Sequence, residues 1–520
     1  MPGSALVFLF SPAEGGHREV APLRLPVHNF RQHIRFGANN PVPLINQPLV
    51  PGSVKPGSGG FTLTVNGTGF SSGSVLNWNG SSRVTEVISN SQLKATINAT
   101  DVAQAGTASV TMVNPGKRNR TSSVAYFTVR EPLSSLALAI DPHLTNAGTV
   151  TVGDFNNDGN LDVAVGLSNG TIQIYLGKGD GTFELPVNTN MSGLPTLMVA
   201  ADFNNDGNLD LAVGDSSLNI THIFLGHGDG TLTEQEPVPG IIEAAGDWNG
   251  DGNLDLALEE TDDFTQWSDI YIGTGNGSFG LGQQGINAVS LFTAAVGDFN
   301  GDGKLDLAFP GVEVLLGNGD GTFQKPVYHH DSNDGRGIVA VDVNGDGNVD
   351  LVTSGISVFL GDGKGGFKDV GGVDFHEQGY NIITGDFNGD GKVDLGVQSV
   401  SCSTECEQAI SVFLGRGDGK FHQVLFLPTG LYSSFPTGFD ARDFNGDGKL
   451  DLIIPSTNTT FLFLQTVASV LPTNLSFGDQ NVGTKSAPQT AAVKNVGSSD
   501  LKIKWDFGYW SGSQRLCRNQ

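Results

Sequence analysis

One nine-residue phrase occurs seven times in this chain, and it limits the possible folds more than any other feature. The first copy runs from Asp154 to Asp162 and reads D-F-N-N-D-G-N-L-D. Every copy has acid or amide side chains at positions 1, 3, 5 and 9 and a glycine at position 6. Alternate residues of a tight loop can point at one centre, and the glycine permits the sharp turn. The copies begin at Asp154, Asp202, Asp247, Asp298, Asp342, Asp386 and Asp443.

Oxygen donors at this spacing are the ligands that calcium prefers in proteins. The phrase therefore predicts up to seven structural Ca²⁺ ions, held by side chains at positions 1, 3, 5 and 9 and by the carbonyl of position 7. The alternative, that these residues only form hydrogen-bonded turns, leaves three aspartates per loop repelling one another. The predicted ligand residues are Asp154, Asn156, Asp158, Asn160, Asp162, Asp202, Asn204, Asp206, Asn208, Asp210, Asp247, Asn249, Asp251, Asn253, Asp255, Asp298, Asn300, Asp302, Lys304, Asp306, Asp342, Asn344, Asp346, Asn348, Asp350, Asp386, Asn388, Asp390, Lys392, Asp394, Asp443, Asn445, Asp447, Lys449 and Asp451.

The acidity of the chain follows largely from these loops. The formal net charge is −26, and the seven phrases hold 21 of the 54 acidic residues. Seven bound Ca²⁺ ions would reduce the net charge to −12. An acidic chain without a basic patch is not expected to bind nucleic acid or anionic membranes.

The spacing of the phrases predicts the fold. Successive copies lie 48, 45, 51, 44, 44 and 57 residues apart, and each unit contains about four short strand-like runs. A period in the forties with four strands per unit is typical of β-propeller blades. An EF-hand is excluded because position 12 is never Glu and strands rather than helices flank the loop. We therefore expect an all-β chain, a seven-bladed β-propeller with calcium loops, preceded by a small immunoglobulin-like β-sandwich.

The phrase and its strand context resemble the FG-GAP/VCBS repeats of integrin α-like β-propellers. That resemblance covers residues 132–466 and implies that the loop joins the first two strands of each blade. The phrases match the family motif at each ligand position and depart only at position 2, where Trp248 and Val343 replace Phe. An enzyme site is not implied.

The seventh repeat is incomplete, since no G-x-G-D-G turn follows its third strand. A strand-like run at residues 133–140 precedes the first repeat. Closed rings leave no exposed sheet edge. We therefore expect this run to complete the last blade.

Residues 41–131 show the alternating pattern of a small sandwich, with strand-like runs at 61–65, 74–78, 93–97, 108–113 and 124–129. Three segments of this region resemble the IPT/TIG immunoglobulin-like domains: F-T-L-T-V-N-G-T-G-F, L-N-W-N-G and A-S-V-T-M-V-N-P. Such domains serve as spacers or interaction surfaces. Trp78 is expected in the core.

The two ends of the chain give weaker signals. Residues 1–40 have no periodicity and are predicted to be a disordered leader without a clear export signal. Residues 467–520 begin like a hydin-type immunoglobulin-like domain and then lose the pattern, which predicts a truncated segment. No apolar run is long enough for a membrane span.

Several other motifs have ordinary explanations beside functional ones. Arg416-Gly-Asp418 spells an integrin-ligand tripeptide but occupies the variable place of a G-x-G-D-G turn. His329 and His330 could hold a transition metal or an anionic sugar, or simply lie in a solvated loop. Cys402 and Cys406 could form a local disulfide or remain thiols, and Cys517 is left over. Trp267, Tyr380 and Tyr432 are candidates for a ligand surface on the face opposite the calcium loops.

The favoured function is a non-catalytic, calcium-binding, secreted or cell-surface protein for binding or adhesion. Its partner would be a protein or a glycan, bound on the face opposite the calcium loops, and the chain itself is expected to be a monomer. Two alternatives stay open at this point: a propeller lectin, and a polysaccharide-active enzyme such as a lyase. No nucleophile elbow, phosphate loop or zinc-protease motif is present in the sequence.

Overall fold

A computed structural model describes residues 41–116, 120–130, 138–144, 147–261, 266–286, 293–329, 336–373, 378–402, 406–431, 438–455, 460–465, 468–471 and 492–495. Within these ranges the regular structure is β-strand, apart from the short 3-10 helix η1 (Ala99–Val102). The all-β prediction is therefore confirmed. No helix in this described part has the length and hydropathy of a membrane span. The predicted leader, 1–40, lies outside the described residues.

The first part of the chain forms a two-sheet sandwich. All five runs predicted between 61 and 129 form strands, because they alternate apolar and polar side chains as a half-buried sheet requires. One sheet has the order β1 (Leu44–Ile45), β3 (Phe61–Thr68), β7 (Gln92–Ile97) and β6 (Thr85–Val87). The other has the order β2 (Ser53–Val54), β10 (Ala125–Val129), β8 (Gly106–Asn114), β4 (Val75–Trp78) and β5 (Ser81–Ser82), with β9 (Arg120–Thr121) also paired to β8.

Trp78 lies in the core of this sandwich, as predicted. Its side chain is 1% exposed, and its ring centroid lies 5.1 Å from that of Phe127. Leu63 and Val65 on β3 enter the same core from the facing sheet. Large buried aromatic pairs of this kind contribute packing energy beyond simple area burial. The sandwich thus has a hydrophobic core of its own.

Residues 138–465 form seven antiparallel sheets in the described part of the chain, which we call blades one to seven. Blades one to three are β12 (Ala147–Gly153), β13 (Asp162–Leu167), β14 (Thr171–Tyr175) and β15 (Val187–Asn190); β16 (Pro195–Ala201), β17 (Asp210–Asp215), β18 (Ile220–Gly226) and β19 (Leu232–Glu234), with β20 (Val238–Pro239) also on β18; and β21 (Ile241–Gly246), β22 (Asp255–Thr261), β23 (Gln266–Gly273) and β24 (Phe279–Leu281). Blades four to six are β25 (Ala295–Gly297), β26 (Asp306–Phe309), β27 (Glu313–Leu315) and β28 (Val327–Tyr328); β29 (Ile338–Val341), β30 (Asp350–Thr353), β31 (Ser357–Gly361) and β32 (Phe367–Gly372); and β33 (Gln378–Gly385), β34 (Asp394–Cys402), β35 (Cys406–Gly415) and β36 (Phe421–Leu431). Blade seven has the order β11 (Leu138–Leu144), β39 (Thr460–Gln465), β38 (Asp451–Ile454) and β37 (Asp440–Arg442).

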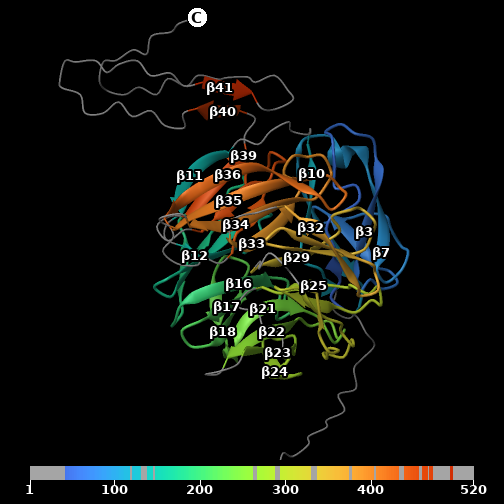
Figure 1. Cartoon of the computed structure of the whole chain (residues 1–520), viewed down its shortest axis with the longest axis vertical. Helices are drawn as coiled ribbons and strands as arrows, with labels where there is room; N and C mark the ends of the chain where they lie inside the picture. Colours follow the sequence, from blue (N-terminus) through green and yellow to red (C-terminus); the bar gives the residue numbers. More distant parts are fainter. Residues whose placement is uncertain are drawn as a thin grey trace, which may run out of the picture. The chain divides into compact units, whose positions relative to one another are not determined.

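The first strands of the blades contact one another in cyclic order. Strand β12 contacts β16, and the contacts continue through β21, β25, β29 and β33 to β37, which returns to β12. The colours of Figure 1 follow this order from teal through green and yellow to orange. Successive sheets around a common axis are the defining arrangement of a propeller.

The N-terminal strand closes blade seven. Strand β11 pairs antiparallel with β39, with Leu138 opposite Gln465 and Asp141 opposite Leu462. In Figure 1 the teal β11 accordingly lies beside the orange strands of the last blade. The predicted closure is therefore confirmed, although the observed strand runs from 138 to 144 and residues 133–137 lie outside the described part.

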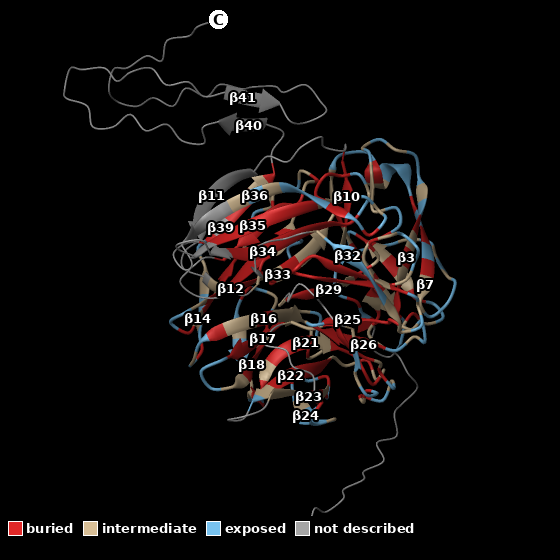
Figure 2. Cartoon of the chain, viewed as in Figure 1, coloured by how far each residue is buried: buried red, intermediate tan, exposed pale blue. Residues whose placement is uncertain are grey.

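The second strand of each blade is the most deeply buried. Strands β17, β26, β30 and β38 are buried along their whole length. The first strand β16, by contrast, is largely half-buried and appears mainly tan in Figure 2. Neighbouring blades share hydrophobic clusters, so that Ile174 of blade one packs in the same cluster as Leu211 of blade two. Full burial of such a side chain stabilises the fold by about 1.5–3 kcal/mol.

Beyond blade seven the structure describes one short hairpin. Strand β40 (Ala468–Leu471) pairs antiparallel with β41 (Ala492–Asn495). The remainder of the segment 467–520 lies outside the described residues. The hydin-type interpretation of this segment therefore stays a prediction.

Candidate metal centres

The seven phrases all form the loop between the first and second strands of a blade. Loop one joins β12 to β13, and loop seven joins β37 to β38. Successive hairpins of an antiparallel sheet leave it at opposite ends. The seven loops and the turns between third and fourth strands therefore share one end of the blades, which we call the loop face.

Each loop is organised by hydrogen bonds from its own main chain. In loop one, the carboxylate of Asp154 accepts bonds from the N–H groups of Asp158 (3.1 Å) and Gly159 (3.0 Å). Asn156 and Asp158 then accept from the N–H groups of positions 5 and 7, at 3.0 and 2.7 Å. The bond from the position-6 glycine recurs in all seven loops at 2.8–3.0 Å. These glycines have φ between 81° and 93°, which explains why no side chain is found there.

The position-9 aspartate has a structural role that the sequence did not indicate. All seven are 0% exposed. In loop two, Asp210 accepts bonds from the N–H of Phe203 and from the N–H of Gly226 on the third strand, both at 2.8 Å. The equivalent pair of bonds occurs in every blade, at 2.7–3.0 Å. Position 9 therefore fastens each loop to its blade.

Burial raises the pKa of these position-9 carboxyl groups. The pKa is about 6 for Asp162, about 7 for Asp210, and about 8 for Asp394 and Asp451, and desolvation is the largest cause in each case. Repulsion from the aspartates at positions 1 and 5 raises it further. Buried carboxylates that repel one another favour a nearby cation.

The donor set of each loop fits a hard cation. Aspartate carboxylates at positions 1 and 5, an asparagine amide at position 3 and main-chain carbonyls are all oxygen donors, which suit Ca²⁺. Among the described residues, however, no three His, Cys, Asp or Glu side chains converge as a metal cluster. The loop oxygens accept main-chain bonds instead, so calcium itself remains a prediction.

Replacing a position-9 aspartate should separate its structural role from metal binding. For Asp210→Ala we expect a loss of about 2–5 kcal/mol in unfolding free energy with and without calcium, because two buried N–H groups lose their acceptor. For Asp206→Ala at exposed position 5 we expect little loss in EDTA and a clear loss in calcium. Urea unfolding of both variants in the two buffers measures this, and equal behaviour of the two would contradict it.

Bonds from the turns connect five of the seven loops to the next blade. The N–H of Gly230, in the third turn of blade two, donates to the carbonyl of Phe155 in loop one at 3.1 Å. Blade seven lacks this turn, and Gln465 makes two bonds that glycine N–H groups make in other blades. Its N–H donates to Asp451 at 2.7 Å, and its side-chain amide donates to the carbonyl of Phe387 in loop six at 2.8 Å.

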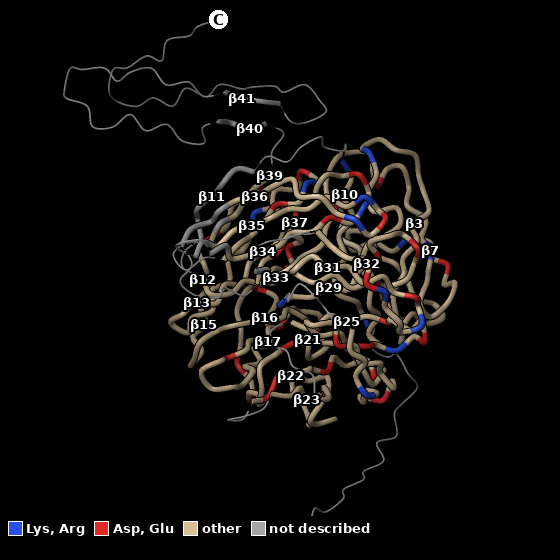
Figure 3. Tube along the Cα trace, in the orientation of Figure 1, with Lys and Arg blue, Asp and Glu red and all other residues tan. Residues whose placement is uncertain are grey.

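The sandwich packs on the loop face. The N–H of Val42 donates to Asp247 of loop three at 2.9 Å, and the N–H of Asp342 of loop five donates to the carbonyl of Gln47 at 3.1 Å. Arg120 bonds the amide oxygen of Asn205 and, at 3.3 Å, that of Asn253. Figure 3 shows basic and acidic residues close together around β10. No local sequence pattern predicts these contacts, since they join residues more than 80 positions apart.

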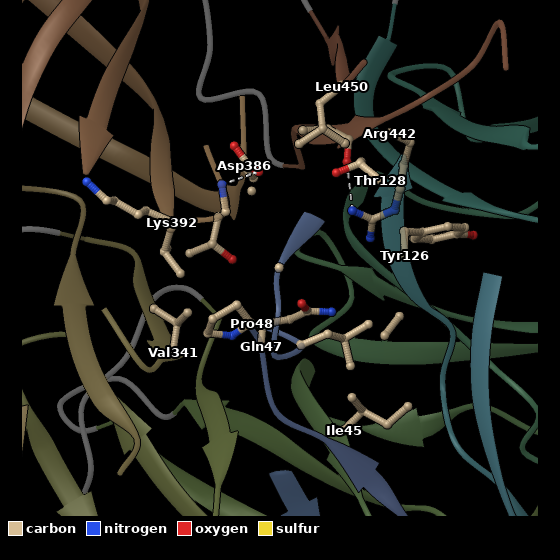
Figure 4. A pocket seen from close by; sticks show the side chains of 18 of the residues that line it. Ile45, Gln47, Pro48, Tyr126, Thr128, Val341, Asp386, Lys392, Arg442 and Leu450 are labelled. Carbon is tan, nitrogen blue, oxygen red and sulfur yellow. Dashed lines mark hydrogen bonds between the residues drawn. The ribbon is translucent and has the colours of Figure 1, made fainter. Parts of the chain in front are cut away.

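A cavity of about 280 Å³ lies between the sandwich and the first strands of blades five to seven. Figure 4 shows Tyr126 and Arg442 on one side and Lys392 on the other, with Gln47 between them. The guanidinium carbon of Arg442 lies 5.2 Å from the centre of the Tyr126 ring. Asp386 of loop six also lines this cavity.

The structure places the other candidate residues as follows. Tyr380 is 8% exposed, and the guanidinium carbon of Arg336 lies 5.0 Å from its ring centre, so little of the ring is left for the predicted ligand surface. Trp267 is half-buried at the start of β23. Cys402 and Cys406 lie opposite each other in register on β34 and β35. Tyr432, His330 and Cys517 lie outside the described residues.

The predicted role of the Arg416 tripeptide as an ordinary turn agrees with the structure. The N–H of Arg416 donates to the carbonyl of Lys420 at 2.9 Å, and Asp418 accepts from the N–H of Lys420 at 3.2 Å. His329 is half-buried, and its ring centroid lies 5.7 Å from that of Phe367. Burial lowers the pKa of His329.

One buried acidic pair was not foreseen from the sequence. Glu243 on β21 is 2% exposed and Glu259 on β22 is 5% exposed. Burial raises the pKa of Glu259 to about 7 and that of Glu243 well above its usual value, with a further contribution from Glu259. The only sequence signal is an acid inside the apolar run of residues 241–245.

The fold and the loops define the class, a β-propeller repeat protein with an N-terminal immunoglobulin-like domain. The FG-GAP-like repeat family matches at 154–213, 202–258, 247–309 and 400–454, and the IPT/TIG domain family matches at 49–129. The chain thus carries FG-GAP-like repeats and an IPT/TIG domain, as its motifs indicated. A search of curated proteins finds no match.

Solved structures share only a remote likeness with the chain. The N-terminal part of BBS1 in complex with ARL6 is 13% identical with a TM-score of 0.41, covering 66% of this chain and all of that one. A quinonprotein alcohol dehydrogenase-like protein from Bacteroides thetaiotaomicron is 12% identical with a TM-score of 0.37, covering 73% and 94%. An auxiliary nutrient binding protein from Bacteroides ovatus is 11% identical with a TM-score of 0.33, covering 81% and 98%. These values carry no argument about function.

Proposed function

We propose that this chain is a calcium-binding, non-catalytic protein for binding or adhesion outside the cell. Its seven loops would hold structural Ca²⁺, and its partner, a protein or a glycan, would bind on the face opposite the loops. The observation that carries this proposal is the sevenfold repetition of one oxygen-rich loop with the same internal hydrogen bonds. An extracellular location suits loops of modest affinity, because calcium there is near millimolar.

Two further observations support the placing of the partner. The sandwich contacts loops two, three and five and so occupies much of the loop face. At the opposite end, the connections differ in length and composition from blade to blade, as in the insertions near residues 262, 331 and 403. Variable connections on a repeated scaffold are the usual place for binding.

Calcium titration of the stripped protein tests the proposal. We expect titration calorimetry or radiolabelled-calcium binding to give several bound ions per chain, because each loop supplies a set of hard oxygen donors. Asp202→Asn should remove one ion. Asp229→Asn, which changes an exposed turn aspartate outside the loops, should remove none.

No uptake at millimolar calcium would contradict the proposal. The same loaded and stripped samples on a glycan array distinguish the kinds of partner. Calcium-dependent hits would identify a glycan-binding ring, and release of cleaved product would identify an enzyme.

A further inference from the structure

The junction between blades six and seven differs from the other blade junctions because blade seven has no turn between a third and a fourth strand of its own. At five junctions, a glycine of the next blade's turn donates its N–H to the carbonyl of loop position 2, at 3.0–3.3 Å. Blade seven lacks that turn, so the end of loop six is left for other groups to cover. The Gln465 side chain makes the missing bond to Phe387.

Arg130, the residue that follows β10 of the sandwich, contacts the adjoining part of loop six. Its side chain is 3% exposed. One guanidinium nitrogen donates to Gln465 at 3.1 Å, and the other bonds the carbonyl of Asp386 and lies 3.5 Å from the Asp386 carboxylate. The side chain also lies against Gly389, where an added Cβ would be 2.6 Å from the Arg130 Nε.

This contact brings a cation to a predicted calcium ligand. Asp386 is position 1 of loop six, and among the described residues it is the only position-1 aspartate with a guanidinium or ammonium group within 4 Å. The sandwich instead contacts loops two and three through amide oxygens of the loops, bonded by Arg120, and through the neutral N–H donor of Val42. A buried guanidinium needs such a carboxylate, because an unpaired buried charge is strongly destabilising.

We propose that Arg130 is a built-in cation of loop six, which docks the IPT/TIG domain and weakens calcium binding at this one loop. The proposal rests on the calcium function above. A metal ion and a guanidinium that share one carboxylate repel each other, and each reduces the benefit that the other gains from it. By linkage, calcium that enters loop six weakens the docking of the domain by the same factor.

Calcium binding to the full chain and to Arg130→Gln tests this proposal. In the wild type we expect the calcium affinity of one site to be about tenfold or more lower than that of the others. Coupled sites typically change each other's affinity by about 5- to 150-fold. Arg130→Gln should tighten that site by a similar factor. The gain should disappear in the double variant Arg130→Gln with Asp386→Asn, because the shared carboxylate is then gone.

Matched variants guard against a simple loss of packing. Ser53→Ala removes the hydroxyl that donates to Gly389 in the same loop at 3.3 Å but changes no charge, so the weak site should stay weak. Arg130→Lys keeps the charge and should also leave it weak. Hydrogen exchange of residues 120–130 in the wild type should rise only at calcium concentrations that fill the weak site.

The outcomes separate the two proposals. If calcium binds and Arg130→Gln leaves every site unchanged, the role of Arg130 is wrong and the calcium function stands. If Ser53→Ala tightens the weak site as much as Arg130→Gln does, packing rather than charge controls it, and the proposal also falls. If neither wild type nor variant takes up calcium, both proposals fall.

Discussion

Adding EDTA to the calcium-loaded protein is expected to lower its melting temperature by about 10 °C or more. A ligand that binds only the folded state stabilises it by about 2.7 kcal/mol per site when its concentration is 100 times the dissociation constant. Several loops acting together would therefore contribute on the order of 10 kcal/mol, and each kcal/mol shifts the melting temperature by about 2 °C or less in a large domain. Calorimetry in calcium and in EDTA measures the difference.

The pH dependence of the stripped protein should have a definite sign. Burial raises the pKa of the position-9 aspartates from 3.8 to about 6 in Asp162 and about 8 in Asp451. A carboxyl group whose folded pKa lies above its unfolded value favours the folded state when protonated, and this advantage is lost as the pH rises through the folded pKa. In EDTA, the melting temperature should therefore fall between about pH 5 and pH 8.

Calcium should reverse or flatten this slope, because bound metal favours the ionised carboxylate. Magnesium at the same ionic strength is the control, since it demands stricter geometry and gives up its water less readily. Identical melting curves in calcium, magnesium and EDTA would show that the loops are hydrogen-bonded turns only.

Replacing β11, residues 138–144, with a Gly/Ser segment of equal length should be similarly damaging. The replacement keeps the tether between the two domains but removes the strand that pairs with β39. Blade seven would then have an exposed edge, and the first and last blades would lose their link. We expect the melting temperature to fall by about 10 °C or more and proteolysis to begin near blade seven.

The matched control replaces β15, residues 187–190, which is also the outermost strand of its blade. Strand β15 follows its own blade directly in the chain, so its loss does not open the ring. A smaller destabilisation is expected there. Equal losses in the two variants would mean that ring closure adds nothing beyond ordinary strand pairing.

The repeated units could be predicted because their signals are local. A phrase of nine residues encodes each loop, and alternating apolar residues encode strands such as β3 and β7. The closing strand could also be inferred, since the missing outer strand of blade seven and the extra run before blade one can be counted in the sequence. The position-2 residues needed only to be large and apolar, and accordingly Trp248 and Val343 are buried like the phenylalanines.

The contacts between the two domains could not be predicted in this way. Arg130 reaches Gln465 across 335 positions, and Val42 reaches Asp247 across 205. No periodicity connects such pairs, and an arginine at the end of a strand is normally solvated. One indirect signal existed, because a blade without its turn leaves main-chain groups that another residue must satisfy. Glutamine at position 465, where other blades have glycine, was the available indication.

The place of Arg130 affects how the ring would respond to mechanical load. Arg130 bonds Gln465, and Gln465 lies opposite Leu138, the first residue of the closing strand. Tension applied through the IPT/TIG domain would therefore reach the buried Arg130 contacts before it could peel β11 from β39. Under such a load, the domain that contacts the loops would also act as an anchor for the strand pair that closes the ring.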